Sequence, residues 1–98
     1  MTRPLIIKPE AEADLDDAKD WYERQRPGLG DAFLLAIEEA LNRIRQTPEM
    51  HAVLKKNVRR SLLPRFPYGI FYRVEKEQIV VLGVFHNRRD PRRWQERA

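Results

Sequence analysis

The stretch "YGIFYRVEKEQIVVLGVFH", residues 68–86, decides the fold of this chain. Its first part, residues 68–75, alternates along the chain, so every second residue from Tyr68 to Val74 shares one face of a predicted strand. Its last part, residues 78–86, is apolar on both faces, as in a central strand covered on both sides. The Lys-Glu pair between them fits a tight turn. Two neighbouring strands of a sheet are therefore predicted.

Two further strands are expected upstream. Residues 58–66, "VRRSLLPRF", are rich in strand-forming residues, but Pro64 cannot donate a ladder hydrogen bond and indicates an edge or a bend. Residues 3–8, "RPLIIK", form a short apolar run that stops at a proline, as a first strand would.

Two helices are predicted between these strands. The first begins at Pro9, the second covers about residues 29–46, and "RPGLG" at 26–30 separates them. Their apolar stripes recur at helical spacing and comprise Ala11, Leu15, Ala18 and Tyr22, then Phe33, Ile37, Leu41 and Ile44. The expected fold class is α+β, in one domain over residues 1–98: an N-terminal strand, an antiparallel α-hairpin, a three-stranded antiparallel meander, and a short C-terminal helix or arm.

An α-hairpin covers only one face of such a sheet, so the C-terminal tail or a partner is expected on the other. Asp90 before Pro91 fits a turn or a helix start. Trp94 is expected to anchor the tail onto the sheet. Trp21, at helical spacing, is expected in the core or as a further apolar anchor for a partner.

Composition limits the classes of function. The 98 residues include no Cys, which excludes disulfides and thiolate metal sites, and the two His lie far apart, so no metal or cofactor is expected. No segment reads as a secretion signal or a membrane span, and a cytoplasmic location is expected.

Charge is distributed unevenly along the chain. Residues 1–54 carry seven Lys and Arg against eleven Asp and Glu, whereas residues 55–98 carry twelve against four. This asymmetry indicates an acidic or polyanionic partner for the second half, or simply solvated charged faces.

Basic side chains gather in two places of the second half. The predicted strand 58–66 and its neighbour carry one group, in which Arg59 and Arg65 are expected on one face and Arg60 on the other. Arginines there suit carboxylate or phosphate partners, or protect a sheet edge by charge. The group comprises Lys55, Lys56, Arg59, Arg60, Arg65 and Arg73.

The second place is "HNRRDPRRW", residues 86–94. His86 at a strand end, beside arginines, could act as a general acid or base, or could be a hydrogen-bonded structural residue. Around it stand Arg88, Arg89, Arg92 and Arg93.

The element order, with residues 59–94 as its most specific part, resembles the RelE/ParE superfamily of toxins from type II toxin–antitoxin modules. Members are often labelled plasmid stabilisation proteins. The ending "VFHNRRDPRRW" looks like the ParE-type branch. The resemblance implies growth inhibition and a cognate antitoxin, whose acidic C-terminal segment wraps the toxin and which alone contacts operator DNA; no membrane partner is implied.

The superfamily has two activities, so the resemblance leaves a choice. RelE-like members cut ribosome-bound mRNA without metal, and this alternative would use His86, Arg60 and Arg88 or Arg89. Leu62 and Gly69, however, stand where that pattern carries a Lys and an Arg, and no Tyr lies in the tail. The departures favour the ParE-like activity, non-enzymatic inhibition of DNA gyrase.

Under the ParE-like interpretation, one set of side chains is expected to contact the target or the antitoxin, and the second face of residues 79–85 is expected to offer an apolar groove. The set comprises Arg59, Arg65, Arg73, Arg92, Arg93 and Trp94.

Overall fold

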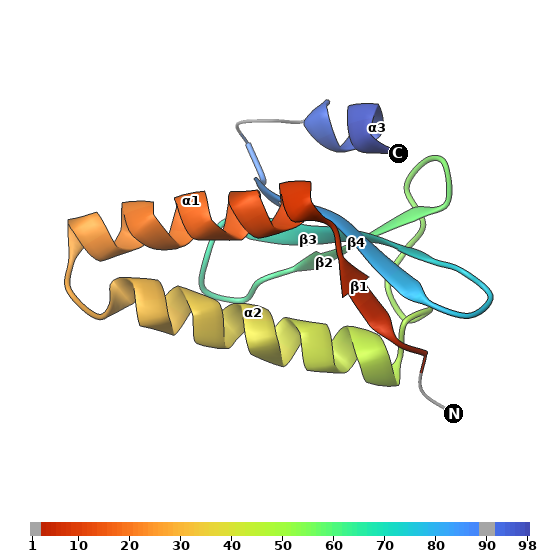
Figure 1. Cartoon of the computed structure of the whole chain (residues 1–98), viewed down its shortest axis with the longest axis horizontal. Helices are drawn as coiled ribbons and strands as arrows, with labels where there is room; N and C mark the ends of the chain where they lie inside the picture. Colours follow the sequence, from red (N-terminus) through yellow and green to blue (C-terminus); the bar gives the residue numbers. More distant parts are fainter. Residues whose placement is uncertain (1–2, 89–91) are drawn as a thin grey trace.

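Two long helices lie side by side and cover one face of a four-stranded sheet (Figure 1). The structure is a computed structural model that describes residues 3–88 and 92–98. The predicted order of elements is confirmed. The elements are β1 (Leu5–Ile7), α1 (Pro9–Gln25), α2 (Leu29–Gln46), β2 (Val58–Leu62), β3 (Tyr68–Val74), β4 (Ile79–His86) and α3 (Arg93–Arg97).

The sheet has the order β1-β4-β3-β2. β2, β3 and β4 form the predicted antiparallel meander, and β1 pairs parallel with β4. β2 is an edge strand that stops at Leu62, short of the predicted end at residue 66, because Pro64 cannot continue the ladder. Arg65 therefore lies beyond the strand, and the prediction that it shares a strand face with Arg59 is wrong.

The turn between α1 and α2 depends on glycine. Gly28 has a φ of 89°, a conformation that side chains with a Cβ rarely adopt. The Glu23 carboxylate accepts hydrogen bonds from the backbone N–H groups of Gly28 and Gly30, and these bonds lower the pKa of Glu23. The local sequence thus fixes the antiparallel course of the two helices.

The helices bury the predicted apolar stripes against one face of the sheet. Phe33 and Ile44 are fully buried, and they belong to one cluster with Ile70 and Tyr72 from β3. The Tyr72 hydroxyl donates to the carbonyl of Pro48 at 2.7 Å, and burial raises the pKa of Tyr72 to about 12.

The opposite face of the sheet is covered by α3, as predicted for the tail. Trp94 is only 8% exposed and stacks on Phe71, with ring centroids 5.5 Å apart. Around this pair lies a second apolar cluster that includes Val80, Leu82 and Phe85. The predicted helix start at Asp90 and Pro91 falls outside the described residues; α3 itself begins at Arg93.

β4, which contributes side chains to both clusters, contains a β-bulge opposite Phe71 and Tyr72. Tyr72 pairs with Val81 and Phe71 pairs with Gly83, so Leu82 is an additional residue in the ladder. Because one inserted residue reverses the alternation, Val81 and Val84 both face the helices. Every β4 side chain after the bulge thus lies on the face opposite to the one that strict alternation assigns.

Charged side chains fasten α3 next to this bulge. Arg97 donates to both carboxylate oxygens of Asp14 on α1 and to the carbonyl of Leu82. Asp14 also accepts a hydrogen bond from the backbone N–H of Val84 at 3.0 Å. One carboxylate therefore ties α1, β4 and α3 together.

Candidate partner-binding surfaces

His86 and Arg60, both assigned to the nuclease alternative, lie on opposite faces of the sheet. His86 pairs with Tyr68 at the end of β4, and their rings lie 5.3 Å apart on the helix-covered side. Arg60 pairs with Phe71, which belongs to the cluster under α3. The backbone of the sheet therefore separates the imidazole from this guanidinium.

Arg60 owes its position to Gly69. A Cβ at Gly69 would lie 3.1 Å from Cγ of Arg60 and 3.4 Å from Oδ1 of Asn87. The arginine stem thus crosses the glycine toward the end of β4. Beside it Leu62 is 51% exposed, so this end of β2 offers a cation next to an apolar side chain.

Arg59 faces the helices and holds the loop after α2. Its Nη1 donates to the carbonyls of Glu49 and His51. Burial, together with the nearby charges of Arg43 and Arg59, lowers the pKa of His51. Arg59 is thus engaged inside the chain, and its predicted role in binding stays a prediction.

The other predicted binding residues are scattered. Arg73 forms a 3.4 Å ion pair with Glu75, and Arg65 is exposed after β2. Trp94 is buried in the second cluster, and Arg93 lies over the ring of Phe85 at 5.3 Å. Their roles in binding also stay predictions.

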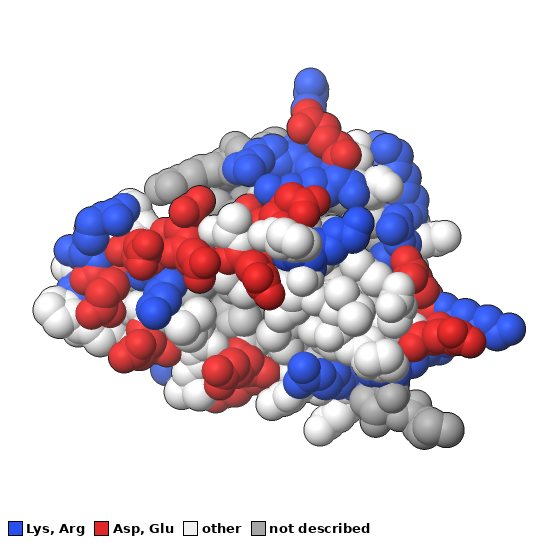
Figure 2. Space-filling model, in the orientation of Figure 1, with Lys and Arg blue, Asp and Glu red and all other residues white. Residues whose placement is uncertain are grey.

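A basic surface forms where the turn before β2 meets α3. Lys55, Lys56 and Arg92 line a shallow cavity of about 450 Å³, and Lys56 donates to the carbonyl of Gln95. Lys56 and Asn57 have φ values of 55° and 62°, so the turn before β2 uses the left-handed region. Figure 2 shows Lys and Arg side chains gathered at the α3 end of the molecule, with Asp and Glu side chains over α1. Arg88 is exposed, and Arg89 lies outside the described residues.

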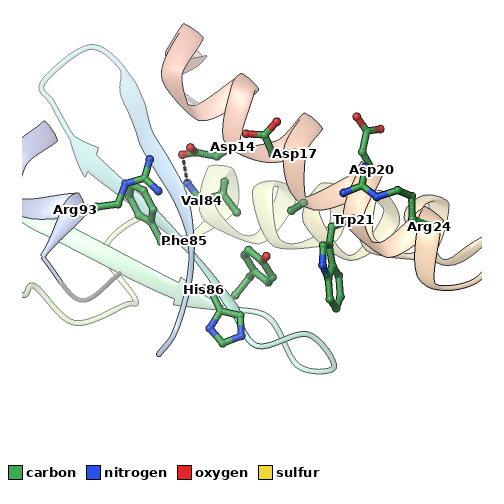
Figure 3. A pocket seen from close by; sticks show the side chains of 11 residues that line it. Asp14, Asp17, Asp20, Trp21, Arg24, Val84, Phe85, His86 and Arg93 are labelled. Atoms are coloured by element: carbon green, nitrogen blue, oxygen red, sulfur yellow. Dashed lines mark hydrogen bonds between the residues drawn. The ribbon is translucent and has the colours of Figure 1, made fainter. Parts of the chain in front are cut away.

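A groove of about 380 Å³ lies elsewhere, between α1 and the end of β4 (Figure 3). The α1 side carries three carboxylates and the half-exposed Trp21, and His86 lies at the β4 end. The lining residues are Asp14, Asp17, Ala18, Asp20, Trp21, Arg24, Tyr68, Val84, Phe85, His86 and Arg93.

This groove corrects the expectation from sequence. An uncovered apolar groove was predicted on the second face of residues 79–85, but α3 covers that face, where Val80, Leu82 and Phe85 are buried. The groove that is present uses the acidic side chains of α1, which sequence reasoning missed as site residues. The i, i+3, i+6 spacing of Asp14, Asp17 and Asp20 beside Trp21 was the available signal.

Within residues 3–88 and 92–98, no group of three or more His, Asp or Glu side chains could hold a metal ion. The same part of the chain contains no helix that is long and apolar enough to cross a membrane.

Two of the solved structures that share this fold come from toxin–antitoxin systems. A chain of the chromosomal ParDE toxin–antitoxin system from P. aeruginosa superposes with a TM-score of 0.67 at 21% identity, covering 87% of this chain and 96% of that one. A chain of the toxin–antitoxin complex RelBE2 from Mycobacterium tuberculosis superposes with a TM-score of 0.60 at 17% identity, covering 88% and 99%. The architecture is therefore that of chains from toxin–antitoxin complexes.

A family model supplies the more specific assignment. The model described as "ParE toxin of type II toxin-antitoxin system, parDE" matches residues 5–91. No curated protein sequence matches the chain significantly. The chain belongs to the ParE toxin family of type II toxin–antitoxin systems.

Proposed function

We propose that this ParE-family toxin acts in the cytoplasm by binding and inhibiting DNA gyrase, and that a cognate antitoxin neutralises it. The observation that carries the proposal is the separation of His86 from Arg60 by the sheet. Metal-free RNA cleavage needs an acid or base and a cation positioned around one phosphate. Because His86 and Arg60 lie on opposite faces, the arrangement does not match this requirement.

The residues around Arg60 also favour binding over cleavage. Leu62 and Gly69 replace the cations of the nuclease pattern, and Gly69 serves here to give the Arg60 stem room. The α3 side of the sheet carries several separate Lys and Arg side chains. Such side chains suit contact with an acidic protein surface or with gyrase-bound DNA. We assign target contact to Arg60, Lys55, Lys56 and Arg92, and contact with operator DNA to the antitoxin.

The test measures supercoiling by purified gyrase in the presence of the purified toxin. We expect inhibition together with a trapped complex of gyrase on cleaved DNA. The double variant Arg60→Glu/Arg92→Glu should raise the inhibitory concentration at least about tenfold, because two charge contacts become repulsive. Arg45→Glu on the exposed side of α2 makes a similar change away from this surface, and it should act like the wild type.

The proposal is wrong if the purified toxin leaves gyrase unaffected and induction of the toxin in cells produces codon-positioned cuts in translated mRNA. Primer extension detects such cuts. Loss of the cuts in His86→Ala would establish the nuclease activity in place of gyrase inhibition.

A further inference from the structure

The groove between α1 and the end of β4 has walls of opposite charge. On one side Asp14, Asp17 and Asp20 follow one flank of α1, and on the other side stands Arg93 of α3 (Figure 3). The groove thus differs from the cavity around Lys55, Lys56 and Arg92, where cations predominate.

The carboxylates on the α1 side of the groove differ in whether they already bind other groups of the chain. Asp14 is engaged by Arg97 and by the backbone N–H of Val84. Asp17 and Asp20 are exposed, and neither forms an ion pair within the described residues. Two negative charges therefore border the groove, with Arg24 one turn farther along the helix.

Apolar and aromatic side chains lie at the floor of the groove, while most of its exposed surface is polar. Ala18 and Val84 are buried there, Tyr68 is half-buried, and Trp21 is 39% exposed with its ring 5.0 Å from that of Tyr22. A large aromatic side chain beside a carboxylate suits a partner that carries both an apolar and a cationic side chain.

We infer that this groove binds an amphipathic segment of the antitoxin whose two polar edges differ in charge. Its apolar side chains contact Trp21 and Tyr68, its Lys or Arg residues lie along Asp17 and Asp20, and its Asp or Glu residues lie toward Arg93. The inference rests on the proposed function, because it takes the antitoxin as the partner.

Charge complementarity selects this occupant. A uniformly acidic segment, which suits the basic second half of the chain, would place carboxylates against Asp17 and Asp20. One polar edge of the segment must therefore carry Lys or Arg residues, and the other edge must carry Asp or Glu residues. That order also fixes the direction in which it lies along α1, because reversing the segment exchanges its two edges.

The test uses the complete toxin and the antitoxin encoded beside the toxin gene, with the dissociation constant measured by calorimetry or by competition. The toxin variant Asp17→Lys/Asp20→Lys should weaken the complex at least about tenfold, since two attractive contacts become repulsive. Asp16→Lys is the matched control: Asp16 is exposed on the same helix, does not line the groove, and should change affinity less than about twofold. Trp21→Ala should weaken binding about tenfold or more.

A complementary change in the antitoxin distinguishes direct contact from a general field effect. Lys or Arg residues of its C-terminal segment are changed to Glu one at a time. At least one of these changes should restore binding to Asp17→Lys/Asp20→Lys while weakening binding to the wild type. For Arg93→Glu, restoration should come from an acidic residue changed to Lys.

Three outcomes count against the inference or against its premise. Equal affinities for Asp17→Lys/Asp20→Lys and Asp16→Lys overturn the inference while the toxin–antitoxin pairing stands. Concentration-dependent dimerisation of the toxin alone that Trp21→Ala abolishes overturns it too, because a second copy then occupies the groove. Failure of the antitoxin to bind the wild-type toxin removes the proposed pairing itself.

Discussion

The two faces of the sheet are closed in different ways. On one face, α1 with 17 residues and α2 with 18 bury a continuous apolar cluster. On the other face, the five-residue α3 supplies one tryptophan and one charged clamp from Arg97 to Asp14. The first face depends on many contacts made by regular helices, and the second depends on few.

The two faces should therefore differ in how much the loss of a single contact destabilises the fold. Loss of one contact on the helix-covered face disturbs a core that every large element shares. Loss of one contact under α3 can let the tail detach while the rest stays folded, because terminal segments open locally at a lower free energy than the whole fold.

The largest expected loss of stability comes from Phe33→Ala. Phe33 is fully buried between the helices and the sheet, and truncation of such a side chain costs about 3–5 kcal/mol. Trp94→Ala should cost only about 2 kcal/mol, because the tail can detach while the helix-covered cluster stays intact.

Urea unfolding followed by circular dichroism measures both values, and hydrogen exchange shows whether Trp94→Ala exposes β4 locally. Leu35→Ala, at a side chain that is 55% exposed, is the control and should stay within about 0.5 kcal/mol of the wild type. An equal loss from Phe33→Ala and Trp94→Ala would mean that the two faces unfold together.

An intermediate effect is expected from Gly83→Ala at the bulge. The added Cβ would lie 2.5 Å from the Phe85 ring and 2.8 Å from Nη1 of Arg97, so these two side chains must move. Overpacking of this kind costs about 1–3 kcal/mol. The loss should be partly restored in Gly83→Ala/Phe85→Leu, which removes the ring. If the second change brings no recovery in the urea midpoint, the contact with Phe85 is not the cause.

The smallest effect concerns pH and the helix-covered face. Burial and the charges of Arg43 and Arg59 lower the pKa of His51 below its ordinary value of 6.5, so the unfolded chain takes up the proton first as pH falls. The free energy of unfolding should therefore decrease as pH drops below about 6.5, and it should gain nothing from this group above that pH.

Comparison of urea midpoints at about pH 7.5 and about pH 5.5 tests this expectation, since the two values bracket the ordinary histidine pKa. His51→Gln should flatten the decrease, and His86→Gln should keep it. A decrease of the same size in His51→Gln would assign the pH dependence to other groups.

Much of the fold could be predicted from sequence because its signals are local. The helical stripes through Tyr22 and Phe33, the turn at Gly28 and the alternation of residues 68–75 each depend on neighbours within one element. The tail was also predictable, since Trp94 was the large apolar side chain beyond the last strand and the second face needed a cover. For the early end of β2 at Leu62, the sequence offered only Pro64, which indicated an edge or a bend but not the last residue of the strand.

The candidate sites depended on distant parts of the chain. Asp17 and His86 line one groove although α1 and β4 are far apart in sequence, and no spacing rule joins them. Lys55 and Lys56 meet Arg92 only because the turn before β2 packs against α3. Sequence could supply the charges of these surfaces but not their grouping.

The amino-acid sequence by itself determined the α+β order, the buried stripes and the excess of cations in the second half. The face on which His86 lies was decided by the tertiary structure alone. Strict alternation along residues 79–86 would put His86 on the face of Val80 and Leu82, the same face as Arg60. The bulge at Leu82 moves it to the helix-covered face, because one additional residue in a ladder reverses every side chain that follows.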